Sequence, residues 1–172
     1  MQLRELFDEF PMGAGEVVPL ALQQLLKEPL NVNEDWQRAE RLLLDARTML
    51  PERLEILVAL YKMYAYSNRF DESMVLIDEV LRRAAGLGDF PTDWNLLCHD
   101  SANWGEATGA VRFYLYSMKA KGFVLLRKAE VTQAYAVLKK LCELDRKDLV
   151  GGSVVLDMAE RILDLDKEDD VA

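Results

Sequence analysis

A helical pattern in this chain returns after 34 residues. Four positions carry side chains of similar character in both copies, with Ala39, Leu43, Ala46 and Pro51 returning as Ser73, Ile77, Val80 and Ala85. A helical hairpin of this period cannot bury its apolar face alone, so neighbouring hairpins stack on one another. Stacked hairpins build an extended groove rather than an enclosed pocket. The pattern therefore predicts an all-α protein that offers a groove to a partner.

Apolar residues at helical spacing predict a series of helices along the chain. The predicted segments are 2–10, 17–27, 34–50, 51–67, 71–85, 104–129, 131–145 and 149–165, with a short apolar segment at 94–97. The first segment is predicted to stop at the proline and glycines of residues 11–15. Asn33 and Asp71 are predicted N-caps, and Asn68 is a turn residue that tolerates a left-handed backbone.

The longest predicted helix, at 104–129, is expected to lie centrally because apolar residues occupy more than one of its faces. Asn103 and Glu106 have the spacing of a capping box at its start. Gly109 and Gly122 each cost such a helix about 1 kcal/mol against alanine. Close contact with another helix would explain both glycines.

The net charge of −9 and the pI near 4.7 argue against nucleic-acid binding, because phosphates repel an acidic surface. Residues 109–150 are an exception, with nine basic against four acidic side chains. This block indicates attraction within the chain, a site for an acidic partner, or merely solvated helix faces. The acidic tail at 166–172 is predicted to be disordered, and it could fold back on the basic block.

The composition favours a cytoplasmic protein without a membrane span, and our functional hypothesis takes it to be bacterial. Two cysteines without a CxxC pair fit a reducing compartment, and no apolar run approaches the roughly 18 residues that cross a bilayer. Cys98, His99 and Asp100 are adjacent, but zinc requires four converging ligands, so we favour a structural role for His99. We expect no metal site, no cofactor, no catalytic residue and no enzymatic activity, since the chain has no phosphate-binding or nucleophile motif.

The spacing at residues 54–87 resembles the tetratricopeptide repeat (TPR) family. The residues that carry the resemblance are Leu57, Leu60, Tyr61, Tyr64, Asn68, Phe70, Ser73, Ile77 and Val80. A second repeat is similar at 115–148, with a half-repeat at 34–53 and a terminal helix at 149–165. The resemblance implies one TPR-like domain over residues 1–165, an α-α superhelix of about 7–9 helices. An irregular helical bundle is the alternative, because residues 88–114 interrupt the period.

In the TPR family the first helix of each hairpin lines a concave groove, and the resemblance places six residues there. They are Lys62, Tyr66, Tyr116, Lys119, Phe123 and Arg127. Alternating cations and rings suit an acidic or apolar segment of a protein partner. The competing interpretation makes the rings core and the lysines solvated surface.

The predicted function is a non-catalytic protein-interaction module. The alternative is a dedicated chaperone or adaptor of a bacterial secretion or assembly system. Residues 86–103 are expected to pack on their own chain, and a homodimer contact through their apolar side chains is the other option.

Overall fold

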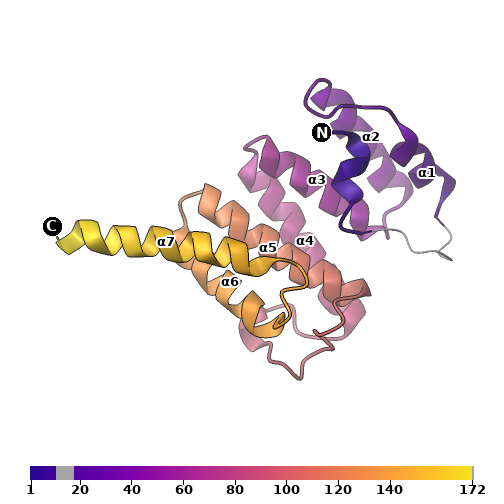
Figure 1. The fold of residues 1–172 in the computed structure, drawn as a ribbon. Coiled ribbons are helices and arrows are strands. Elements are labelled where there is room, and N and C mark those ends of the chain that lie inside the picture. Colours follow the sequence, from indigo (N-terminus) through magenta and orange to yellow (C-terminus); the bar gives the residue numbers. More distant parts are fainter. Residues whose placement is uncertain (11–17, 172) are drawn as a thin grey trace. The chain divides into compact units, whose positions relative to one another are not determined.

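The computed structural model describes residues 1–10 and 18–171, and these residues form a helical protein (Figure 1). The elements in order are η1 (Leu3–Phe7), α1 (Leu20–Lys27), α2 (Trp36–Met49), α3 (Leu54–Tyr66), α4 (Phe70–Gly88), η2 (Trp94–Leu96), α5 (Gly109–Arg127), α6 (Val131–Leu144) and α7 (Gly152–Val171). The predicted all-α class is confirmed, with seven α-helices and two short 3-10 helices in this part of the chain. The predicted stop of the first helix at 11–15 lies outside the described residues.

The chain divides into two compact units, Met1–Leu76 and Ile77–Ala172. The single domain that the sequence predicts over residues 1–165 stays a prediction. The boundary lies inside α4, so this helix contributes its first residues to one unit and the rest to the other.

In the first unit, α3 is the buried helix. Nearly every one of its residues is out of contact with solvent, as expected for a helix that is apolar on all sides. α2 and η1 pack against α3, and α1 packs against α2. Ser73 at the start of α4 is fully buried, and its hydroxyl donates to the carbonyl oxygen of Tyr61 at 2.9 Å. The small side chain that the repeat pattern requires at this position therefore lets α4 approach α3.

In the second unit, α6 packs on both α5 and α7, and α5 and α7 also contact each other. Gly122 allows the first of these contacts, because a Cβ atom there would lie 2.4 Å from Cγ of Leu138. Gly152 allows the contact between α6 and α7, because a Cβ atom there would lie 2.6 Å from Cδ2 of Leu141. The close contact predicted at Gly122 is thus present. At Gly109 the prediction is wrong, because nothing lies within 4 Å of that Cβ position.

The predicted start of the long helix near residue 104 is also wrong. Trp104 is 3% exposed, its ring centroid lies 5.2 Å from that of Phe90, and its Nε1 donates to the carbonyl oxygen of Cys98 at 2.9 Å. These contacts hold the segment as a loop. Ala107 and Gly109 then have positive φ angles of 44° and 52°, which residues inside an α-helix do not adopt. The helix therefore does not extend back past Gly109, which is the first residue of α5.

Other boundaries differ from the sequence prediction by a few residues. Asp35 rather than Asn33 caps α2, by accepting a hydrogen bond from the backbone N–H of Arg38 at 3.3 Å. Asp71 lies inside the first turn of α4, one residue after the start of that helix. Asn68 has the predicted left-handed conformation, with φ of 60°. α7 continues to Val171, and the predicted disorder of the acidic tail at 166–172 stays a prediction.

Candidate functional site

Four of the six predicted groove residues form a line along α5. Tyr116, Lys119, Phe123 and Arg127 are spaced by three, four and four residues, which places them on one face of the helix. The Nζ atom of Lys119 lies 4.9 Å from the ring centroid of Tyr116. The Cζ atom of Arg127 lies 6.0 Å from the ring centroid of Phe123. Each cation thus lies over the ring one turn before it, within the range of cation-π attraction.

The two halves of this α5 line differ in accessibility. Tyr116 is 7% exposed, and Lys119 donates from Nζ to the carbonyl oxygen of Val150 at 2.6 Å. Lys119 therefore helps to fix the turn between α6 and α7. Phe123 is half-buried and Arg127 is exposed. The accessible part of the α5 line is its C-terminal half.

The turn that Lys119 reaches is built around two aspartates. The buried carboxylate of Asp145 accepts backbone N–H groups from Leu149 and Val150, both at 2.9 Å. Asp148 accepts the backbone N–H of Ser153 at 3.0 Å. Its pKa is lowered, chiefly by the hydrogen bond from the Ser153 hydroxyl, although desolvation opposes this shift. These contacts position the start of α7 against α5 and α6.

The remaining two predicted groove residues, Lys62 and Tyr66, lie on α3 in the first unit. Lys62 is 7% exposed, because its Nζ pairs with a carboxylate oxygen of Glu9 at 2.5 Å and donates to the carbonyl oxygen of Leu6 at 3.2 Å. Lys62 thus fastens the N-terminal segment to α3. Tyr66 is 56% exposed. A single groove shared by all six residues stays a prediction.

Sequence reasoning missed a cluster around Arg69, where α2, α3 and α4 meet. The Arg69 guanidinium lies 4.6 Å from the ring centroid of Trp36 and 4.4 Å from that of Tyr64. It pairs with Glu40 at 2.9 Å and with Glu72. Tyr64 donates its hydroxyl to Glu40, and burial followed by this bond raises the pKa of Tyr64 to about 12. We interpret this Arg69 cluster as a structural joint.

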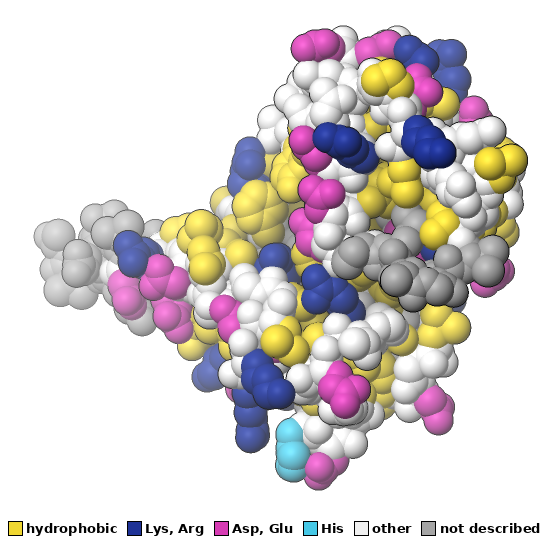
Figure 2. Space-filling view, turned by 45° about the vertical axis from the view of Figure 1, so that its right-hand side comes forward, with side chains coloured by type: hydrophobic (Ala, Val, Ile, Leu, Met, Phe, Trp, Pro, Cys, Tyr) yellow, Lys and Arg dark blue, Asp and Glu magenta, His cyan; other side chains and the backbone are white. Residues whose placement is uncertain are grey.

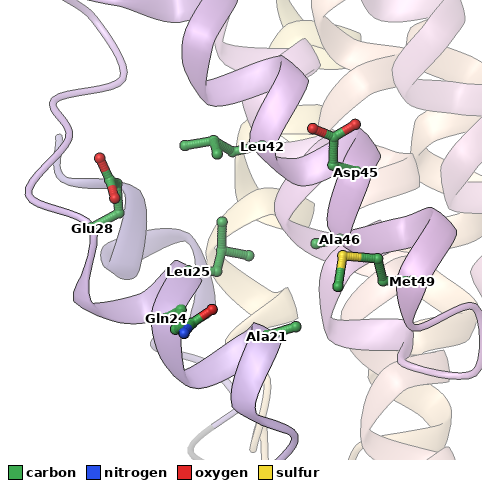
Figure 3. Close-up of a pocket in the computed structure, with 8 residues that line it drawn as sticks. All are labelled: Ala21, Gln24, Leu25, Glu28, Leu42, Asp45, Ala46 and Met49. Carbon is green, nitrogen blue, oxygen red and sulfur yellow. The ribbon is translucent and has the colours of Figure 1, made fainter.

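A cavity of about 340 Å³ lies between α1 and α2 (Figure 3). It is lined by Ala21, Gln24, Leu25, Glu28, Leu42, Asp45, Ala46 and Met49. Leu25 and Leu42 project into the space between the two helices, and the carboxylates of Glu28 and Asp45 lie at its edges. Met49 is 65% exposed. This lining could accept an apolar side chain.

The loop that contains the single histidine forms another cavity, of about 330 Å³. Its lining residues are Leu97, Cys98, His99, Lys140, Glu143, Leu144 and Arg146. The His99 imidazole is the one cyan side chain at the surface in Figure 2, and its Nε2 lies 3.0 Å from a carboxylate oxygen of Asp100. The Ser101 hydroxyl lowers the pKa of the Cys98 thiol. Among the described residues, acidic, cysteine and histidine side chains form no group of three that could hold a metal ion.

An apolar stripe runs along the outer face of α7. Val154, Met158 and Ile162 are 61%, 47% and 37% exposed, and they recur every four residues. The next residues along the chain, Val155 and Ala159, are buried. Figure 2 shows apolar side chains beside acidic ones on the part of α7 before its grey end. The sequence predicts a helix at 149–165 from its apolar spacing, but the spacing does not show which apolar side chains face solvent.

No helix among residues 1–10 and 18–171 combines the length and apolarity needed to cross a bilayer. No family model and no solved structure matches the chain, so the resemblance to the TPR family stays a prediction. A curated relative, described as an uncharacterized 19.8 kDa protein in the nifW 5′ region of Azotobacter chroococcum mcd 1, is 31% identical over 125 residues. The aligned stretch covers 70% of this chain and 68% of that protein.

Proposed function

The chain belongs to the same protein family as the Azotobacter relative, and from that premise we propose that it is a non-catalytic interaction module that binds a segment of a partner protein. The TPR-like groove predicted from the sequence is part of this proposal. The relative's description places its gene in the nifW 5′ region, so the product of nifW is the first defined partner to examine.

The observation that carries the proposal is the α5 line of alternating rings and cations. Phe123 supplies apolar area, and Arg127 supplies exposed positive charge one turn away. Aromatic rings and arginine are the residues that contribute most to binding energy at protein interfaces. The proposed ligand is therefore a polypeptide segment that combines a carboxylate with an apolar side chain.

Local charge supports an acidic ligand despite the negative total. α5 and α6 lie within residues 109–150, where basic side chains outnumber acidic ones by nine to four. A locally positive surface raises the association rate of an acidic segment, and the effect weakens with salt. Arginine suits a carboxylate because its planar guanidinium can donate two parallel hydrogen bonds.

A photo-crosslinking amino acid placed at position 123 in the native host tests the proposal first. We expect it to capture one defined polypeptide. The control has the same crosslinking group in place of Gln133, an exposed residue of α6, and should not capture that polypeptide. The product of nifW can be examined directly, as a purified protein. Capture of the same set of proteins at both positions would contradict the proposed surface.

Affinity measurements with the captured partner then test whether the positive charge of Arg127 contributes to binding. We expect Arg127→Glu to weaken binding about tenfold, which is about 1.4 kcal/mol. Arg82→Glu makes the same charge change at an exposed position on α4 and should leave affinity unchanged. Equal effects of the two substitutions would mean that only total charge matters, and the α5 line would not be the site.

A further inference from the structure

Two long faces of α7 have different surroundings. One face packs on α6 and α5 through Val155 and Ala159, which are 9% and 0% exposed. Gly152 brings the start of this face against Leu141 of α6. This side of α7 is therefore fixed within the second unit.

The face next to it, about 100° around the helix, carries the α7 stripe of Val154, Met158 and Ile162. Residues four apart lie one above the other on a helix, so the three side chains form a continuous row about 12 Å long. All three are more than a third exposed. Single exposed apolar residues are ordinary, but a row on one helix face is the arrangement into which the apolar face of another helix packs.

Charge next to the stripe indicates the kind of helix that fits. Asp157, Glu160 and Asp164 lie on the solvent-facing side of α7, and Arg161 pairs with Asp157 at 2.9 Å. Residues 151–172 contain seven acidic and two basic side chains. A partner helix beside this row gains favourable electrostatics from lysine or arginine and loses them from aspartate or glutamate.

The same charges disfavour a second copy of the chain. Two α7 helices packed antiparallel about a twofold axis would place the same flank of each copy against the other, because such an interface is self-complementary in position. Acidic flanks would then repel. Charge complementarity therefore favours a basic partner over self-association.

We propose that the α7 stripe docks an amphipathic helix of a partner protein whose apolar row is flanked by lysine and arginine. The α7 stripe involves none of the residues of the α5 line. This inference therefore goes beyond the proposed function, and each can fail without the other.

A defined peptide tests the proposal on the full-length protein. The probe is a labelled helical peptide of about 18 residues with leucine at helical spacing and lysine on both flanks. A first control peptide has glutamate in place of every lysine. A second control peptide has the same composition as the lysine peptide, with its residues in scrambled order. Fluorescence anisotropy should show saturable binding of the lysine peptide, with the other two about tenfold weaker or worse.

Protein variants locate the binding site. Met158→Gln and Ile162→Gln should each weaken binding of the lysine peptide about tenfold. Both residues are exposed, so circular dichroism should be unchanged. Leu87→Gln, at a 71% exposed position on α4, should leave peptide affinity unchanged.

Three results would overturn the proposal. The first is equal binding of the lysine and scrambled peptides, which would show attraction to charge alone. The second is peptide binding that neither stripe substitution weakens. The third is a dimer at neutral pH that Met158→Gln dissociates, which would make a second copy the occupant of the stripe.

Discussion

Gly122 determines how closely α5 and α6 approach. Its missing side chain leaves room for Leu138, which a Cβ atom would meet at 2.4 Å. Gly122→Ala should therefore lower the free energy of unfolding by about 1–3 kcal/mol through overpacking, despite alanine's better helix propensity. Gly86 on α4 is the matched control, because nothing lies within 4 Å of its Cβ position. Urea denaturation should show Gly86→Ala to be stabilising by about 0.5–1 kcal/mol, and equal effects of the two substitutions would contradict this account.

The two cysteines should differ in reactivity. Cys98 is exposed, and the Ser101 hydroxyl, followed by the backbone of Asp100, lowers the pKa of its thiol. Burial raises the pKa of Cys142, and nearby Asp148 adds to this. Because the thiolate is the nucleophile, iodoacetamide at neutral pH should alkylate Cys98 well before Cys142. Peptide mass spectrometry over time measures both rates.

The Ser101→Ala substitution tests the cause of that difference. Loss of the hydroxyl should raise the pKa of Cys98 and slow its alkylation at neutral pH. Above the shifted pKa, both proteins would have a full thiolate and the rates should converge. A slower rate that persists at high pH would indicate a change in access to Cys98 rather than in its ionisation.

At the scale of whole elements, the Arg69 cluster joins α2, α3 and α4. Arg69→Met removes two ring contacts and two ion pairs at once, and we expect a loss of about 1–2 kcal/mol of unfolding free energy. Arg69→Lys should retain little of the stability that Arg69→Met loses, because an ammonium group neither stacks flat on two rings nor forms two parallel hydrogen bonds. Urea denaturation of both variants measures this. Full stability of Arg69→Lys would show that charge alone holds the joint.

Most helices could be predicted from periodicity because each presents its apolar face at regular spacing. The errors concern ends, where contacts distant in sequence decide. Trp104 has helical spacing with the residues that follow, but its indole donates to Cys98 and packs against Phe90. Asn33 is a good cap by residue type, yet the backbone places Asp35 in the capping position. Neither outcome follows from a local window of sequence.

The candidate site was predicted only in part for the same reason. The spacing of Tyr116, Lys119, Phe123 and Arg127 places them together on α5, because helix geometry alone fixes their relation. Burial of Lys62 could not be predicted, since its partner Glu9 is 53 residues away. Exposure of Met158 depends on which face of α7 packs on α6, which periodicity alone does not decide.

At the scale of the molecule, net charge and exposed apolar surface act against each other. The chain has a net charge of −9 at pH 7, so copies repel one another. The exposed α7 stripe offers apolar surface that would be buried if copies came together. Solubility at neutral pH therefore depends on ionised carboxylates. Protonating them toward the pI near 4.7 removes the repulsion but leaves the stripe.

Light scattering as a function of pH should consequently show association as the pH falls toward about 5. Met158→Gln changes no charge and interrupts the stripe, so this variant should associate less at the same pH. Leu87→Gln removes an apolar side chain from α4 that is more exposed than Met158, 71% against 47%, and should behave as the unmodified protein. Far-UV circular dichroism at each pH must show intact helices, because unfolding would expose other apolar surface. Equal scattering by all three proteins, with helices intact, would show that the α7 stripe does not drive association.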